Sequence, residues 1–275
     1  MTMHNSLGGG ARGYNPLRIK NKNLLQKVKN IVIINTILNK REVFIKKGFT
    51  LAEVLITLGI IGVVAAMTLP SVITNSRNKQ LEVGLKKSYS VISQALNQYQ
   101  AETGERITFE NQGIHTLKPI LMKYFKTVQD CGFGTDVNKA CIPNKYYLPE
   151  EDKADARGYR TYDGKAEINM GAFDDGQFVL NDGSLILIQN DPISSTLLLI
   201  SVDVNGYNKK PNRLGHDLFV FQIDNKGTLL PMGVKGTAYP SNSVHCSISS
   251  SNAMNGAGCT YNALTDKDYF KNLPK

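Results

Sequence analysis

The sequence predicts an α+β protein in which one long N-terminal helix packs on a head built around an antiparallel β-meander. Three observations lead to this fold class. A run without charge extends from Val54 to Leu69, apolar residues recur at helical spacing over 81–99, and apolar segments alternate with turn residues after Gln177. The chain has 275 residues, 41% of them hydrophobic, so it is long enough for one large domain or two smaller ones.

The basic charge of the chain is confined to its first 48 residues. The net charge is +9, but ten of the 32 Lys and Arg and only one of the 23 Asp and Glu lie in residues 1–48. Residues 49–275 therefore hold 22 basic and 22 acidic side chains and are formally neutral. A domain that binds nucleic acid usually has a basic surface, so no nucleic-acid partner is expected.

The first predicted element is an apolar helix over residues 49–69, interrupted by one charged residue, Glu53. At about 1.5 Å per residue, its 21 residues span the roughly 30 Å hydrocarbon core of a bilayer. Gly59 and Gly62 favour a membrane helix over the buried helix of a soluble protein, because small residues let membrane helices pack closely. A secretory signal peptide is the second alternative, but the helical pattern continues past Pro70, which a discarded signal would not need.

An amphipathic helix follows and is expected to cover the head. Its apolar positions recur every three or four residues, at Leu81, Leu85, Tyr89, Ile92, Leu96 and Tyr99. Gly104 is the predicted C-cap. We therefore expect a single helix from Phe49 to Thr103, with a free coiled coil as the alternative for its second half.

The predicted head begins after this helix. A short helix is expected at 116–127 and a charged loop at 149–164. After Gln177 the apolar segments predict an antiparallel meander of about four strands, in which Asp182-Gly183 is a strong hairpin signal. The tail from Gly236 is rich in Ser, Asn and Gly and is predicted to be a stapled surface loop.

All four cysteines follow the apolar run, at Cys131, Cys141, Cys246 and Cys259. If this part is exported, an even number of cysteines predicts disulfides, and four cysteines allow three pairings. We favour Cys131–Cys141 and Cys246–Cys259 because each bridge closes a short loop. Four reduced thiols in a cytosolic protein are the alternative, and no Cys/His spacing supports a zinc site.

The junction before the apolar run carries a specific motif. Residues 46–49 read Lys-Lys-Gly-Phe, Glu53 lies four residues past Phe49, and Pro70 follows the apolar run. This pattern resembles the processing motif of type IV prepilins and type II secretion pseudopilins. The resemblance implies that a membrane peptidase cuts after Gly48 and that Phe49 becomes the N-methylated N-terminus. It also implies that Glu53 pairs with the terminal amine of a neighbouring subunit.

Elementary electrostatics agrees with that role for Glu53. A charge at the centre of a bilayer costs about 2.5–3.5 kcal/mol or more. A buried acid without a partner is destabilising, so the carboxylate favours docking beside a positive amine. The alternative is that Glu53 lies at the membrane boundary and reaches toward water.

The resemblance divides the chain into three parts. A basic leader, residues 1–48, is removed on processing. A long helix, residues 49–103, follows, and its residues 49–69 cross the membrane or line the filament core. A globular α+β head occupies residues 104–275. The leader is long for this family, so we expect that translation starts downstream of Met1.

The function implied is that of a structural subunit of a type II secretion pseudopilus or a type IV pilus-like filament. The expected partners are prepilin peptidase, copies of itself and other pilin-like subunits, the inner-membrane assembly platform, and membrane lipid before assembly. The leader would be cytoplasmic, and the head periplasmic or extracellular. The alternative is an uncleaved, single-pass membrane-anchored sensor or adhesin. No catalytic motif is found, so the protein is not expected to be an enzyme, and His216 is interpreted as a solvated loop residue.

A loop between two predicted strands is rich in hard oxygen donors. It resembles the loop of major type II pseudopilins that binds calcium and stabilises the head, and this resemblance makes Asp203, Asn205 and Asp217 the candidate ligands. Calcium is the one cofactor expected. Asp, Asn and Gly are also common turn formers, and that alternative stays open.

Overall fold

The computed structural model describes residue 29, residues 48–190 and residues 197–274. The chain divides into two units, residues 1–63 and 64–275. Apart from Lys29 and Gly48, the predicted leader lies outside the described residues, including its basic pair at 46–47.

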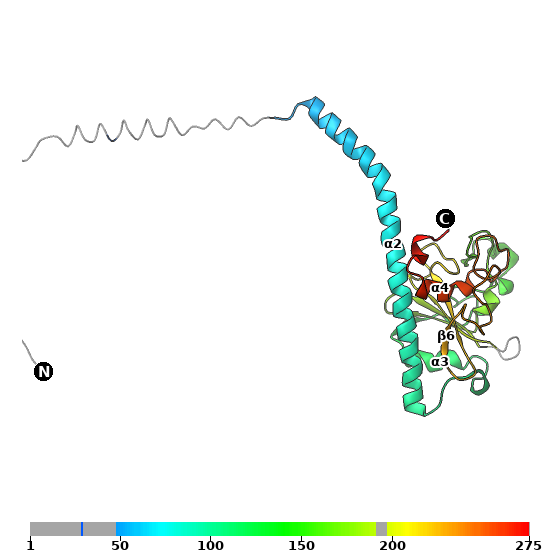
Figure 1. Cartoon of the computed structure of the whole chain (residues 1–275). Coiled ribbons are helices and arrows are strands. Elements are labelled where there is room, and N and C mark those ends of the chain that lie inside the picture. The colour runs from blue at the N-terminus through cyan, green and yellow to red at the C-terminus, as the bar shows by residue number, and fades with distance from the viewer. Residues whose placement is uncertain (1–28, 30–47, 191–196, 275) are drawn as a thin grey trace, which may run out of the picture. The chain divides into compact units, whose positions relative to one another are not determined.

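The dominant element is helix α2, which extends from Leu51 to Thr103 (Figure 1). It begins two residues later than predicted and ends where predicted. Gly104 adopts a φ of 78° and its amide donates to the carbonyl of Gln100, which confirms the predicted C-cap. In the part of the chain that the structure describes, α2 is the one helix long and apolar enough to cross a membrane. Pro70 lies inside it, as expected.

In the second unit, one stripe of α2 is buried against the sheet. Its residues recur every three or four positions, at Asn78, Leu81, Leu85, Ser88, Ile92 and Ala95. The prediction placed Tyr89, Leu96 and Tyr99 in this stripe, but these side chains flank it and are half-buried. Large side chains reach around the helix, and Tyr89 stacks on Phe221 with ring centroids 5.6 Å apart.

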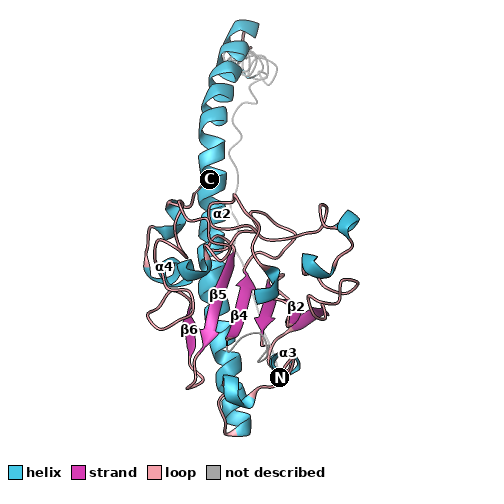
Figure 2. Ribbon diagram, turned by 90° about the vertical axis from the view of Figure 1, so that its right-hand side faces the viewer, coloured by secondary structure: helices cyan, strands magenta, loops and turns pink. Residues whose placement is uncertain are grey.

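The described residues form one six-stranded sheet in which neighbours in sequence pair antiparallel (Figure 2). Its strands are β1 (Thr127–Asp130), β2 (Gly176–Leu180), β3 (Leu185–Gln189), β4 (Leu198–Asp203), β5 (Leu218–Ile223) and β6 (Leu229–Pro231). The predicted antiparallel meander is confirmed, but the prediction of about four strands was too low. The predicted helix at 116–127 is shorter in the structure: α3 covers Leu117–Met122, and β1 begins at Thr127.

The sheet is buried on both faces. One face, with Phe178, Ile200 and Phe221, packs against the buried stripe of α2. The opposite face, with Leu187 and Leu199, packs under the irregular segments around 131–173 and 232–257. Antiparallel sheets often leave one face in water, so burial on both sides explains why these strands read as continuous apolar runs.

Short 3₁₀ turns complete the described fold. They lie at Phe109–Asn111, Lys145–Tyr147, Glu150–Asp152, Met170–Ala172, Ala257–Cys259 and Tyr269–Lys271. The predicted loop at 149–164 contains one of these turns and no strand or α-helix.

The tail enters the core from Met254 onward, so its prediction as a surface loop is wrong for this second half. Met254, Ala257, Ala263 and Phe270 are buried, and α4 covers Thr260–Thr265. A polar sequence is compatible with this burial because its amide side chains bond to the backbone of the tail itself.

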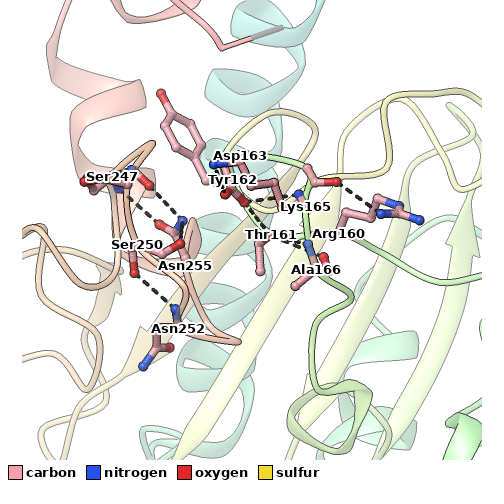
Figure 3. Close-up of polar contacts among 12 residues, drawn as sticks. Arg160, Thr161, Tyr162, Asp163, Lys165, Ala166, Ser247, Ser250, Asn252 and Asn255 are labelled. Carbon is pink, nitrogen blue, oxygen red and sulfur yellow. Dashed lines mark hydrogen bonds and ion pairs between the residues drawn. The ribbon is translucent and has the colours of Figure 1, made fainter.

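Asn255 illustrates how the tail satisfies its own polar groups. It is fully buried, and its Nδ2 donates to the carbonyls of Ser247 and Ser250 while its Oδ1 accepts from the Ser247 amide (Figure 3). The Tyr162 amide donates to the Asn255 carbonyl and joins the tail to the 161–166 turn. Asn78 on α2 donates to the carbonyl of Phe270 at 2.6 Å, which fixes the end of the tail to the helix.

Both predicted disulfides are present. Cys131 is bonded to Cys141, and Cys246 is bonded to Cys259. No described cysteine is free. The second bridge holds the buried end of the tail to its exposed part.

The contact between α2 and the sheet predicts a large effect of truncating Leu85. This side chain is fully buried, and Leu85→Ala is expected to lower the free energy of unfolding by about 2–5 kcal/mol. Val83, on the same turn but 55% exposed, is the matched control, and Val83→Ala should change it by less than about 0.5 kcal/mol. Denaturant unfolding of the full chain in detergent, followed by the near-UV circular dichroism of its tyrosines, measures both. Equal losses would contradict the observed burial.

Candidate processing and assembly site

The predicted cleavage junction is exposed. Gly48, Phe49 and Thr50 precede α2, have no regular secondary structure and are open to solvent. The Phe49 side chain is 85% exposed. A Cβ added to Gly48 would meet no atom within 4 Å, so no described residue covers this bond. An exposed segment without regular secondary structure is accessible to a peptidase, and Gly48 lets the backbone approach such an enzyme closely.

Glu53 and Thr50 form a capping box at the start of α2. The Thr50 amide and hydroxyl both donate to Glu53 Oε2, at 2.8 and 2.9 Å, and the Glu53 amide donates back to Thr50 Oγ1 at 3.2 Å. These bonds satisfy amides that a helix leaves without partners in its first turn. This role was not predicted from the sequence, although Thr-x-x-Glu before an apolar run is its usual signature.

The capping box uses only one oxygen of the Glu53 carboxylate. Oε2 accepts both bonds from Thr50, and within the described part of the chain Oε1 accepts none. The carboxylate can therefore cap its own helix and still accept a hydrogen bond from another group. An amine on a neighbouring molecule is one such group, and a charge-assisted bond to it would be stronger than a neutral one.

The helix after Glu53 presents apolar side chains on all sides. From Leu51 to Ile73 its large apolar residues are exposed, namely Leu51, Val54, Leu55, Ile56, Leu58, Ile60, Ile61, Val63, Val64, Met67, Leu69, Val72 and Ile73. A continuous apolar surface of this extent requires lipid or other helices around it. Gly59 and Gly62 leave open space at their Cβ positions, where another helix could approach closely.

Comparison with known proteins identifies this segment. Residues 45–69 match the family model described as the prokaryotic N-terminal methylation motif. This motif is the signature that type IV pilins and pseudopilins share. No curated protein and no solved structure matches it. The pilin motif implies processing by a prepilin peptidase and assembly with other pilin subunits. Together with the exposed apolar helix, it fits a membrane-anchored protein with a periplasmic or extracellular head.

The predicted calcium ligands of this pilin-like chain lie together at one end of the sheet. Asp203 ends β4 and Asp217 precedes β5, and both carboxylates are fully buried. Asp203 accepts hydrogen bonds from the Tyr159 hydroxyl and the Gly206 amide at 2.7 and 2.9 Å. Asp217 accepts from the amides of residues 212 and 213 at 2.7 and 2.8 Å. Both acids therefore organise the backbone of this loop.

The buried acids and amide oxygens of this loop could be stabilised by a cation. Burial, followed by the charge of Asp217, raises the pKa of Asp203 to about 8. Burial also raises the pKa of Asp217 to about 6. The side-chain oxygens of Asn205 and Asn212 are buried without a hydrogen-bond partner. Two desolvated carboxylates and two such amide oxygens are the donor chemistry that calcium prefers. No cluster of three or more His, Cys, Asp or Glu suited to a metal exists among the described residues.

His216 is not the solvated residue that the sequence predicted. It is 2% exposed, and its Nε2 lies 3.0 Å from the carbonyl of Tyr162. Burial, with Arg213 and Arg77 as weaker causes, lowers the pKa of His216 to about 4. The imidazole is therefore neutral at physiological pH and fixes the backbone of the 161–166 turn.

The capping box predicts a local effect of substituting Thr50. Thr50→Ala removes the acceptor of the Glu53 amide, and the loss of such a cap costs about 0.5–2 kcal/mol. Backbone amides at Glu53 and Val54 should then exchange with deuterium about fivefold faster, measured by NMR of the full chain in detergent micelles. Thr50→Ser keeps the hydroxyl and should restore protection. Unchanged exchange in Thr50→Ala would show that the box does not hold the first turn.

Proposed function

We propose that this protein is a structural subunit of a type II secretion pseudopilus or a type IV pilus-like filament. In the proposal, prepilin peptidase cuts the precursor between Gly48 and Phe49 and Phe49 is N-methylated. The subunit then leaves the bacterial inner membrane through the assembly platform and joins the filament through α2. The methylation motif at 45–69, which includes the exposed apolar start of α2, carries this proposal.

The geometry at the start of α2 supports a two-part role for Glu53. Before assembly, Oε2 accepts from the Thr50 amide while Thr50 Oγ1 accepts from the Glu53 amide, so both amides stay satisfied in surroundings without water. After cleavage, the new amine of Phe49 is positive, and Oε1 of a neighbouring subunit is available to accept from it. Pairing then relieves two unpaired charges at once, because a buried carboxylate and a buried ammonium are each costly alone.

The apolar surface of α2 supports the second half of the mechanism. Its exposed side chains need lipid in the unassembled subunit, and the apolar helices of neighbouring subunits can replace that lipid. Transfer between lipid and protein changes little in hydrophobic free energy, since both surroundings are apolar. Moving α2 from lipid into the filament therefore gains little free energy from burial, and charge pairing at Glu53 supplies the free energy that favours assembly.

The N-terminus of the mature protein tests the proposal. Mass spectrometry of the protein from membranes of its native host should find a methylated Phe49 and no leader. Glu53→Gln retains an oxygen that can cap the helix but loses the charge, so it should be cleaved normally yet enter filaments poorly. Glu82→Gln, on the same helix beyond the apolar segment, is the control and should assemble. An intact leader, with the peptidase active on other substrates, would favour an uncleaved membrane-anchored sensor or adhesin.

We propose in addition that the head binds one calcium ion through Asp203, Asn205 and Asp217. Bound there, the ion would neutralise two buried carboxylates and stabilise the loop between β4 and β5. The unpartnered amide oxygen of Asn205 supports its inclusion. Calcium usually takes roughly six to eight oxygen ligands, and backbone carbonyls or water would supply the remaining ones.

Thermal unfolding of the full chain in detergent tests calcium binding. At about 100 times its dissociation constant, calcium should stabilise the head by about 2.7 kcal/mol relative to chelator. Asp217→Asn should abolish this shift. Asp224→Asn, in the turn before β6, is the matched control and should keep it, because Asp224 bonds only to nearby amides. Absence of both a thermal shift and calorimetric heat in the unsubstituted protein would overturn the site.

A further inference from the structure

Four basic side chains meet at one cleft of the head. Arg77 on α2, Arg160, Lys210 and Arg213 line a cleft of about 500 Å³, and no Asp or Glu is among its described lining residues. Arg77, Arg160 and Lys210 are exposed, and Arg213 is half-buried. Residues 49–275 are formally neutral as a whole, so this concentration of positive charge is local.

These four cations differ from the basic residues that follow Arg77 on α2. Lys79 and Lys86 pair with Glu82, and Lys87 pairs with Asp182. Among the described residues, none of the four cleft cations has an ion pair. Arg160 donates to the carbonyl of Gly164 at 3.1 Å, and Figure 3 shows its guanidinium directed away from the tail loop. Like charges held together without acids repel one another, so an anion is the expected occupant.

The position of Arg77 on α2 indicates where that anion is found. Ile73 is the last large residue of the exposed apolar series, and Arg77 follows it by four residues, or about 6 Å of helix. The polar headgroup layer is about 5–8 Å thick on each side of a bilayer core. In a helix the Cα–Cβ bonds tilt toward the N-terminus, so the Arg77 side chain leaves α2 on the side of the apolar segment. The cation therefore lies at headgroup depth whenever that segment is in lipid.

We infer that this cleft binds the phosphate of an anionic phospholipid headgroup while the unassembled subunit is in the membrane. The inference rests on the membrane insertion in the proposed function and goes beyond it. Guanidinium groups match phosphate oxygens in pairs, and three arginines with one lysine provide several such donors. The contact holds the head against the membrane surface, and the subunit must give it up when it enters the filament.

Native mass spectrometry of the full chain in detergent tests this binding, with phosphatidylglycerol and phosphatidylcholine supplied in equal amounts. The unsubstituted protein should retain phosphatidylglycerol preferentially. Removing one cation should reduce this preference about fivefold, so Arg77→Gln with Lys210→Gln should reduce it roughly 25-fold. Both side chains are exposed, and neither has a hydrogen bond or ion pair within the described structure, so this variant is expected to fold.

Two matched variants separate the cleft from general charge. Arg77→Lys with Lys210→Arg keeps both charges and should keep most of the preference. Lys123→Gln with Lys235→Gln removes two exposed cations outside the cleft and should change it less than about twofold. Equal losses in the two Gln variants, or no preference in the unsubstituted protein, would overturn the inference.

Two further arms identify the source of the phosphate. Displacement of phosphatidylglycerol by millimolar inorganic phosphate would indicate a site for free phosphate and would overturn the lipid assignment. Tighter binding of a short DNA duplex than of lipid, lost in the Arg77→Gln/Lys210→Gln variant, would overturn it in favour of nucleic acid. Cleavage after Gly48 is measured in parallel on each variant. Normal cleavage without lipid preference rejects only the cleft, whereas absent cleavage rejects the proposed function.

Discussion

The structure of the head depends on how closely α2 approaches the sheet. Small residues at Ser88 and Ala95 interrupt the larger apolar side chains of the buried stripe, and Gly84 lies so near β4 that a Cβ there would be 3.1 Å from Val204 Cβ. This distance is tighter than ordinary van der Waals contact, so a larger residue at position 84 would push the helix outward. The close approach of α2 to the sheet also makes contacts at the edges of the head possible. Asn78 reaches the end of the tail, and Lys87 reaches the β2–β3 turn at Asp182.

Local chemistry made part of this fold predictable. Gly104 ends α2 because a positive φ suits glycine, and Asp182 with Gly183 turns β2 into β3, with the Asp182 carboxylate accepting from Ser184. Strand β1 was missed because it is an edge strand with exposed side chains, which leaves no apolar alternation to detect. The tail was missed for the opposite reason. Its polar side chains suggested solvent, but the buried Asn255 amide is satisfied by the backbone of the half-buried Ser247 and Ser250.

The candidate sites were predictable to different degrees for the same reason. Gly48, Phe49 and Glu53 stand in a short linear motif, so sequence alone places them together. The capping bonds between Thr50 and Glu53 are equally local. The basic cleft joins residues from α2, the 160 region and the loop at 210–213, which only the folded chain brings together. Composition pointed away from it, because a domain with equal numbers of acids and bases can still separate them in space.

Assembly requires that the charges on this helix exchange partners rather than lose them. Glu53 begins the apolar segment with one oxygen capping its own helix and the other uncommitted. Arg77 follows that segment, and no Asp or Glu is among the described residues that line its cleft. A subunit whose charges were fully paired internally would gain no electrostatic free energy by moving between surroundings. A subunit with no partner in the membrane would be unstable there. An incomplete set of internal partners, supplemented by lipid phosphate and later by another subunit, satisfies both requirements. The free oxygen of Glu53 and the guanidinium of Arg77 are therefore not defects of packing, because each can form a further bond when the subunit changes its surroundings.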